Sequence, residues 1–355
     1  MTAQPAIPLL QQLIATPSFS REEQATAQLL FDALQQQRLA PHRHLNNVYS
    51  RCERYDEAKP TLLLCSHHDT VRPAAGYTRN PFAPTVESGK LYGLGSNDAG
   101  ASVVALMAAY RALYRQPLPF NLTLALVAEE EVQGPNGVEA LRPLLGDIAC
   151  AIVGEPTQMQ AAVAERGLMV LDCTARGRQG HAARGEGDNA LYHAIDDIRR
   201  LQALRFPKAS ASMGEVKLTA TMMTCGTQHN VVPAECKFVV DVRPTDAYDN
   251  HELLALIRAA VQCDVQPRST RLRASAIAGG HPLVQAARAV GRATYVSPTT
   301  SDIALLRLPA IKMGPGDSAR SHAADEYVAL SEVEEAIGTY VALISKLADL
   351  WSATA

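Results

Sequence analysis

The sequence predicts an α/β protein with a mainly parallel sheet flanked by helices, into which a smaller α+β domain is inserted. Short apolar runs typical of buried strands occur at residues 61–65, 122–128 and 150–154. Between the first two runs, residues 101–115 carry apolar side chains at the spacing of a helix. Buried strands that alternate with helices are typical of a parallel sheet covered on both faces, so we assign the first domain to this class.

The inserted domain is predicted from a change of pattern near Glu165. Beyond this residue the strand-like segments alternate apolar and polar side chains instead of being continuously apolar. The expected elements are a strand at 168–177, a helix at 189–204, two strands at 214–226 and 235–244, and a helix at 251–261. With a closing strand, this is the β-α-β-β-α-β order of a ferredoxin-like unit.

Patterns of the first domain resume after about residue 275, with a helix expected at 281–291 and a strand at 310–314. We therefore predict a first domain formed by residues 1–165 and 276–355, and an inserted domain at 166–275. Two helices of the first domain are expected to begin at capping boxes, Ser20 with Glu23 and Ser331 with Glu334.

Composition and charge exclude several classes of protein. Of the 355 residues, 47% are hydrophobic and 19% are charged, which is typical of a globular chain. The net charge of -3 argues against a nucleic-acid-binding surface, and no apolar run is long enough to span a membrane. The N-terminal residues lack the basic and apolar regions of a signal peptide. Because the seven cysteines form no CxxC pair, we expect reduced thiols and a cytoplasmic protein.

Polar side chains follow each of the three predicted buried strands. Open α/β sheets place their ligands beyond the carboxyl ends of the strands, so we expect these side chains to meet at one edge. Two further candidates are Asp98 in the run GLGSNDAGAS and His322 in the run GPGDSARSHAADE. The residues at the strand ends are His67, His68 and Asp69, then Glu129, Glu130 and Glu131, then Glu155.

A metal site is the interpretation we prefer, although each residue has an ordinary alternative. The three consecutive glutamates could be a solvated helix start, His67 or His68 a core residue, and His322 a loop residue without function. Convergence of five carboxylates without a cation, however, would force protonation or cost several kcal/mol for each one left unpaired. Imidazole and carboxylate ligands without thiolate suit zinc, cobalt or manganese, with zinc as the default. The five carboxylates are those of Asp69, Asp98, Glu130, Glu131 and Glu155.

The order of these motifs resembles that of the di-zinc aminoacylase and deacetylase family. The sequence has HxD at His67 and Asp69, GxGSxD ending at Asp98, a glutamate pair, GEP, and a late histidine. The resemblance covers essentially the whole chain, including residues 176–190 and 226–233 of the inserted domain. Its members include acetylornithine deacetylase, succinyl-diaminopimelate desuccinylase, aminoacylases and some carboxypeptidases and dipeptidases. The resemblance implies a zinc aminopeptidase-like catalytic domain and an inserted dimerisation or lid domain.

The resemblance also implies a ligand set for two zinc ions per subunit, for which cobalt can substitute. His67, Asp98 and Glu155 would bind one ion, while Asp98, Glu131 and His322 would bind the other, so that Asp98 bridges them.

The remaining roles are implied in the same way. Asp69 would hold His67 in the required tautomer, and Glu130 would be the general base. His181 matches a histidine that the partner subunit contributes to oxyanion stabilisation, which implies a homodimer. Asn230 and Arg243 match positions that bind the substrate, with a structural ion pair as the alternative for Arg243. Glu129 receives no role.

The implied reaction is hydrolysis of the amide bond of a small-molecule N-acyl amino acid. The run SNDAGAS, without the lysine found in many relatives, resembles a subgroup that acts on N-acetyl-L-ornithine or N-acetyl-L-citrulline in arginine biosynthesis. The sequence does not distinguish an acetyl from a succinyl group, or ornithine from citrulline. The alternatives are succinyl-diaminopimelate desuccinylase, a dipeptidase or carboxypeptidase-like enzyme, and a non-catalytic protein that kept the fold. The last alternative predicts lost ligands, whereas every ligand position is filled.

Overall fold

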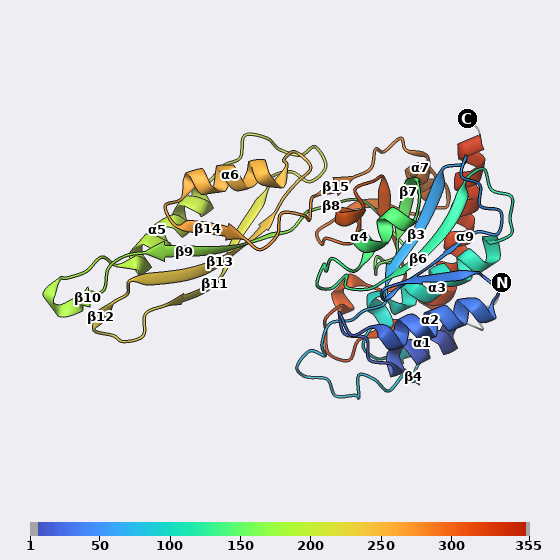
Figure 1. The fold of residues 1–355 in the computed structure, drawn as a ribbon, viewed down its shortest axis with the longest axis horizontal. Coiled ribbons are helices and arrows are strands. Elements are labelled where there is room, and N and C mark those ends of the chain that lie inside the picture. Colours follow the sequence, from blue (N-terminus) through green and yellow to red (C-terminus); the bar gives the residue numbers. More distant parts are fainter. Residues whose placement is uncertain (1–5, 353–355) are drawn as a thin grey trace. The chain divides into compact units, whose positions relative to one another are not determined.

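A computed structural model describes residues 6–352 and divides the chain into two compact units (Figure 1). Unit 1 comprises Met1–Val163, Ile277–Tyr295 and Ser301–Ala355, and unit 2 comprises Ala164–Ala276 and Val296–Thr300. The sequence-based boundaries had placed residues 296–300 in the first domain. They belong to unit 2 because the chain there bonds to Arg166, whose carbonyl accepts the hydroxyl of Thr300 at 2.9 Å.

The central sheet of unit 1 has four parallel strands in the order β6-β3-β7-β17, extended by antiparallel strands at both edges. The predicted α/β fold with a mainly parallel sheet is thus confirmed for the centre of the sheet. The full order is β1-β2-β6-β3-β7-β17-β8-β15, and β16 pairs with β8 beside this path, where β15 is Ser275–Ala276 and β16 is Thr294–Ser297. The strands are β1 (Pro41–His44), β2 (Asn47–Arg51), β3 (Thr61–His67), β6 (Asn121–Val127), β7 (Ile148–Val153), β8 (Ala161–Glu165) and β17 (Ala310–Lys312).

Helices cover the sheet, which explains why its central strands are continuously apolar. All residues of β3 and β6 are buried. The helices of unit 1 are α1 (Ala6–Ala15), α2 (Gln24–Gln36), α3 (Ala101–Leu113), α4 (Val138–Leu141), α7 (Pro282–Ala289), α8 (Ile303–Leu306) and α9 (Leu330–Ser352). A separate small sheet has the order β18-β5-β4, with β4 (Thr85–Glu87), β5 (Lys90–Tyr92) and β18 (Tyr327–Ala329).

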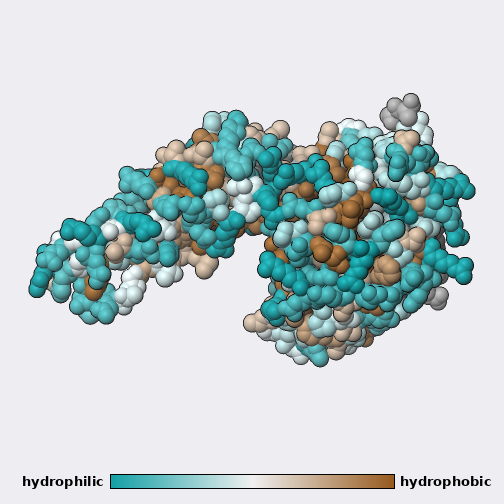
Figure 2. Space-filling view, viewed as in Figure 1, coloured by the Kyte–Doolittle hydropathy of each residue, from teal (hydrophilic) through white to brown (hydrophobic). Residues whose placement is uncertain are grey.

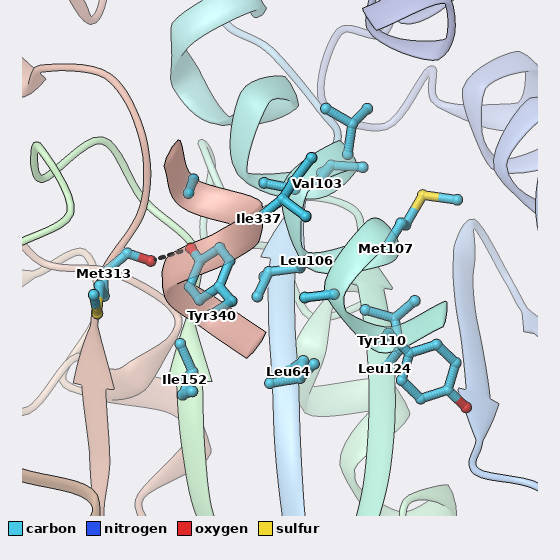
Figure 3. Packing of buried hydrophobic residues seen from close by; sticks show 14 of the residues in the cluster. Leu64, Val103, Leu106, Met107, Tyr110, Leu124, Ile152, Met313, Ile337 and Tyr340 are labelled. Atoms are coloured by element: carbon cyan, nitrogen blue, oxygen red, sulfur yellow. Dashed lines mark hydrogen bonds between the residues drawn. The ribbon is translucent and has the colours of Figure 1, made fainter. Parts of the chain in front are cut away.

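The main core of unit 1 lies where α3 and α9 pack against the strands (Figure 3). In this cluster Leu106 of α3 lies between Ile337 of α9 and Leu64 of β3. Tyr340 of α9 is fully buried, and its hydroxyl donates a hydrogen bond of 2.6 Å to the carbonyl of Met313. The core therefore holds α9 against the loop that follows β17.

Neither predicted capping box is present. Helix α2 has Glu23 at its N-cap without a side-chain cap, and the hydroxyl of Ser20 instead donates to Asp69 at 2.7 Å. Helix α9 already begins at Leu330, so Ser331 lies inside its first turn. The acid that reaches back to the helix start is Glu332, which accepts the N–H of Ala329 at 2.8 Å.

Unit 2 contains a four-stranded antiparallel sheet in the order β11-β13-β9-β14. Its main elements follow the predicted β-α-β-β-α-β order: β9 (Met169–Arg176), α5 (Ala190–Ala203), β11 (Lys217–Cys225), β13 (Glu235–Arg243), α6 (Asn250–Ala260) and β14 (Asp264–Pro267). A separate two-stranded ribbon of unit 2 is formed by β10 (Gly180–His181) and β12 (Val231–Val232). The chain passes between the units within β8 and β16 (Thr294–Ser297), and the unit 2 end of β8 pairs with β15 (Ser275–Ala276).

The visible surface of each unit is mostly hydrophilic, with hydrophobic residues in small scattered groups (Figure 2). Among residues 6–352, no helix is both long enough and apolar enough to cross a membrane.

Candidate metal centre

The predicted acids and histidines of unit 1 meet at the carboxyl edge of its parallel strands. Strand β3 ends at His67, β6 is followed by Glu130 and Glu131, and β7 is followed by Glu155. These strands are neighbours and run parallel, so their carboxyl ends lie at the same edge of the sheet. Asp98 comes from the turn Ser96–Gly100 that leads into α3, and His322 from the loop between β17 and β18.

Asp98 lies between the two histidines. Its Oδ1 is 3.2 Å from Nε2 of His67, and its Oδ2 is 3.8 Å from Nε2 of His322. Nε2 of His67 is also 3.7 Å from Glu155, and Nε2 of His322 is 3.0 Å from Glu131. Each histidine therefore faces its own glutamate, and the two pairs share one aspartate.

Asp69 is fully buried behind this arrangement. Its backbone carbonyl is 3.0 Å from Nδ1 of His67, closer than its carboxylate at 3.5 Å. The carboxylate instead accepts the backbone N–H groups of Glu130 at 3.1 Å and Glu131 at 3.2 Å, and the hydroxyl of Ser20. Burial favours a higher pKa, but the hydrogen bonds from His67 and Ser20 hold the pKa of Asp69 below its ordinary value.

Two neighbouring candidates point away from the centre. Glu129, with a left-handed φ of 57°, uses its carboxylate to accept the side-chain amide of Asn136 at 2.8 Å. His68 is buried between Thr26 and the carbonyl of Asn46, and burial lowers its pKa to about 4. Glu129 thus stabilises the loop from Glu129 to Asn136, and His68 is a neutral core residue.

Glu326 belongs to the site although the sequence analysis did not select it. Its buried carboxylate accepts the backbone N–H groups of Gly95, Asn97 and Asp98. The available signal was its position in the run SHAADE, four residues after His322. No local pattern indicates that this acid reaches a turn more than 220 residues away.

The donor set of the centre suits divalent metal ions. Carboxylate oxygens and imidazole nitrogens lie close enough to share an ion in two groups, His67 with Asp98 and Glu131, and His67 with Glu130 and Glu155. Burial raises the pKa of Glu130 well above its ordinary value and that of Glu155 to about 8, and neighbouring carboxylates add to both effects. A divalent cation relieves this repulsion, so the residues fit the predicted metal.

The other predicted residues lie in unit 2. The exposed His181 ends β10 and the exposed Asn230 directly precedes β12, and the carbonyl of Asn230 accepts the N–H of Ala182 at 3.0 Å. Arg243 pairs with Asp241 of the same strand through two hydrogen bonds, of 2.7 and 3.0 Å. The ion pair left open by the sequence analysis is thus formed, and it occupies the Nε and Nη2 edge of the guanidinium.

A comparison with protein families matches residues 63–346 to peptidase family M20/M25/M40. The chain belongs to this family. Membership confirms the resemblance drawn from the motifs and makes the protein a metal-dependent hydrolase. It also supports zinc as the cofactor, in agreement with the acid and histidine groups of the centre.

Curated relatives cover nearly the whole chain. The succinyl-diaminopimelate desuccinylase of Delftia acidovorans is 27% identical over 379 residues, which cover 96% of this chain and 97% of the relative. The enzyme of the same name from Stenotrophomonas maltophilia is 29% identical over 373 residues, with 95% and 97% covered.

Similar solved structures confirm the fold. Aminopeptidase PepT from Bacillus cereus has a TM-score of 0.79 at 17% identity, covering 98% of this chain and 99% of its own. YxeP from Bacillus subtilis, described as a dinuclear metal-binding peptidase of family M20, has a TM-score of 0.73 at 16% identity, with 98% of both chains covered.

Proposed function

We propose that this M20-family protein hydrolyses the amide bond of an N-acyl amino acid and releases the free amino acid and a carboxylate. The observation that carries the proposal is the position of Asp98, whose two oxygens face His67 and His322 separately. This is the arrangement that a carboxylate bridging two metal ions requires.

The proposed ligand sets follow the observed pairs. His67, Asp98 and Glu155 hold one zinc ion, and Asp98, Glu131 and His322 hold the other. When bound, the zinc ions supply Lewis acidity that lowers the pKa of a water molecule and polarises the acyl carbonyl.

Glu130 is the proposed general base. Among the described residues its carboxylate has no hydrogen-bond partner, whereas Glu131 is engaged by His322. The backbone N–H of Glu130 donates to Asp69. This bond fixes the point from which the Glu130 side chain extends beside the proposed ligands. Glu130 takes a proton from the attacking water and returns it to the departing amine.

His181 is the proposed donor to the oxyanion, contributed by a partner subunit. Its Nδ1 accepts the N–H of Ala183 at 3.2 Å, so in the neutral ring the proton sits on Nε2. Because the ring is exposed, its Nε2–H group can donate a hydrogen bond to an acceptor that is not part of unit 2. Arg243 and Asn230 remain proposed substrate-binding residues, and Arg243 would bind a substrate carboxylate through Nη1 or by exchanging Asp241.

A homodimer is part of this proposal. Strand β11 lies at the edge of the unit 2 sheet and is mostly exposed, including Met222 at 66% and Met223 at 41%. An exposed apolar edge strand is suited to pair with the same strand of a second copy.

A mixed-dimer experiment tests whether His181 acts across subunits. Glu130→Gln and His181→Ala chains, each inactive alone, are co-expressed with different tags. If His181 acts in the partner subunit, each mixed dimer has one working site of two. Because about half of the dimers in a random mixture are mixed, the mixture regains about a quarter of the parent activity. No recovery, or full activity in a monomer measured by light scattering, contradicts the cross-subunit role.

The proposed substrate class is an amino acid with a short acyl group. The curated relatives are named for N-succinyl-diaminopimelate, which makes this compound the first to test. N-acetylornithine and N-acetylcitrulline, and with them arginine biosynthesis, rest on the motif resemblance alone. The predicted cytoplasmic location remains a prediction that agrees with seven free cysteines.

A substrate panel tests the proposed function. Zinc-loaded protein is assayed with N-succinyl-diaminopimelate, N-acetylornithine, N-acetylcitrulline, N-succinylcitrulline and several dipeptides. We expect kcat/KM for one acyl amino acid to exceed that of every dipeptide by at least about tenfold, a difference of about 1.4 kcal/mol in transition-state binding. A preference for dipeptides would assign the metal centre to a peptidase instead.

A further inference from the structure

Glu326 holds the turn that carries Asp98. The acid is 3% exposed. Its Oε1 accepts the backbone N–H groups of Asn97 at 2.8 Å and Asp98 at 2.9 Å, and its Oε2 accepts the N–H of Gly95 at 3.1 Å. One side chain therefore fixes the backbone of Asp98 itself and of Gly95 and Asn97 before it.

The same turn is held from a second side. The side-chain amide of Asn97 donates to the carbonyl of Asp317 at 3.1 Å and accepts the N–H of Asp317 at 2.9 Å. The loop approaches so closely that a Cβ on Gly316, whose φ is +85°, would lie 2.2 Å from Oδ1 of Asn97. The loop that contains His322 is therefore joined to the Asp98 turn at Asp317 and again at Glu326.

The chemistry of these contacts requires a carboxylate at position 326. Oε1 accepts two of the three N–H groups and Oε2 accepts the third, and a carboxyl group presents acceptor oxygens on both sides. A glutamine of the same length would present an NH₂ group to at least one of the donors. An aspartate would keep the charge but would be one methylene too short to reach all three donors.

We propose that Glu326 is a positioning residue that fixes Asp98 for both metal ions and couples it to His322, the ligand four residues earlier on the same loop. The inference rests on the proposed metal centre and adds a residue that lies outside the ligand set. Outer residues that orient metal ligands typically contribute about 10–100-fold to metal affinity.

Zinc affinity of the full-length chain tests the proposal. Metal-free parent, Glu326→Gln, Glu326→Asp and Asp325→Asn are titrated with zinc against a chromophoric chelator, and cobalt spectra report the coordination geometry. Asp325→Asn is the matched control, because it removes the same charge from the adjacent residue. Its carboxylate accepts N–H groups of Thr78 and Arg79 and makes no bond to the Asp98 turn.

We expect Glu326→Gln and Glu326→Asp to bind zinc about 10–100-fold more weakly and to change the cobalt spectrum, while Asp325→Asn matches the parent. Parent-like zinc affinity in Glu326→Gln or Glu326→Asp would overturn the positioning role. An equal loss in Asp325→Asn would overturn it as well, because charge or general stability would then explain the effect. A parent chain that binds fewer than two zinc ions would contradict the proposed metal centre itself.

Discussion

The carboxylate of Asp69 accepts the backbone N–H of Glu130 at 3.1 Å. It also accepts the N–H of Glu131, and the same residue contacts Nδ1 of His67 through its backbone carbonyl. One buried acid thus orients the proposed base and two proposed ligands, which come from two neighbouring strands.

Replacement of Asp69 is expected to loosen Glu130 and Glu131, whose backbone N–H groups donate to its carboxylate, while the backbone contact to His67 remains. In Asp69→Asn, the new NH₂ group would face the N–H of Glu130 or Glu131, so one hydrogen bond is lost. We expect zinc affinity to fall about 10–100-fold, measured by competition with a chelator. Ser20→Ala, which removes only the hydroxyl contact to the same carboxylate, serves as the control with a smaller effect. Unchanged zinc affinity in Asp69→Asn would contradict this role.

Glu130→Gln should separate chemistry from metal binding. The amide cannot take a proton from water, so we expect kcat to fall by about 10²–10⁴-fold while both zinc ions stay bound. Glu129→Gln is the neighbouring control, because Glu129 contacts Asn136 and not the centre. If Glu130→Gln instead lost zinc, measured by elemental analysis, the roles of Glu130 and Glu131 would have to be exchanged.

His322→Ala is expected to lose one of two zinc ions. Within residues 6–352, the imidazole contacts Glu131 at 3.0 Å and Asp98 at 3.8 Å and not Glu155, so only the second proposed ligand set is broken. Elemental analysis after gel filtration measures the stoichiometry. His42→Ala removes an exposed histidine of β1 and should retain both ions. Two zinc ions in His322→Ala would remove His322 from the ligands.

The stability of unit 1 should depend on pH through His281. Its Nδ1 accepts the N–H of Leu283 at the start of α7, which requires the neutral ring, and burial lowers its pKa. The unfolded chain therefore binds more protons below about pH 6.5, and this contribution to stability is lost as the pH falls through that range.

Urea unfolding of the metal-free protein at pH 7.5 and 5.5 measures the effect. At pH 7.5 we expect His281→Ala to cost about 0.5–2 kcal/mol, whereas His281→Asn keeps a cap. Because asparagine does not titrate, the parent should lose stability relative to His281→Asn between pH 7.5 and 5.5. Parallel losses in both proteins would show that another group is responsible.

Tyr340→Phe tests the contact between α9 and the loop after β17. The substitution keeps the packing of the ring but removes the donor to the carbonyl of Met313. We expect the free energy of unfolding to fall by about 1–3 kcal/mol, measured by denaturant titration. Tyr327→Phe is the control, because that hydroxyl has no hydrogen-bond partner among residues 6–352. An equal effect in both variants would contradict the proposed contribution.

The sequence by itself determined the three central strands and the residues at their ends. Continuous apolar runs can be buried on both faces only inside a covered sheet, and neighbouring parallel strands end at one edge. His67, Glu131 and Glu155 were therefore predictable from local pattern. The ion pair of Arg243 with Asp241 was also within reach, because residues two apart on a strand share a face.

Only the tertiary structure decided which groups hold the ligands in place. Ser20 was expected to cap α2 but bonds to Asp69, 49 residues away, and Glu326 reaches the Asp98 turn across 228 residues. A hydrogen bond between distant segments depends on where the folded sheet and loops bring the chain, and no local spacing encodes that distance. The sequence thus determined the chemical groups of the centre, and the fold decided their orientation.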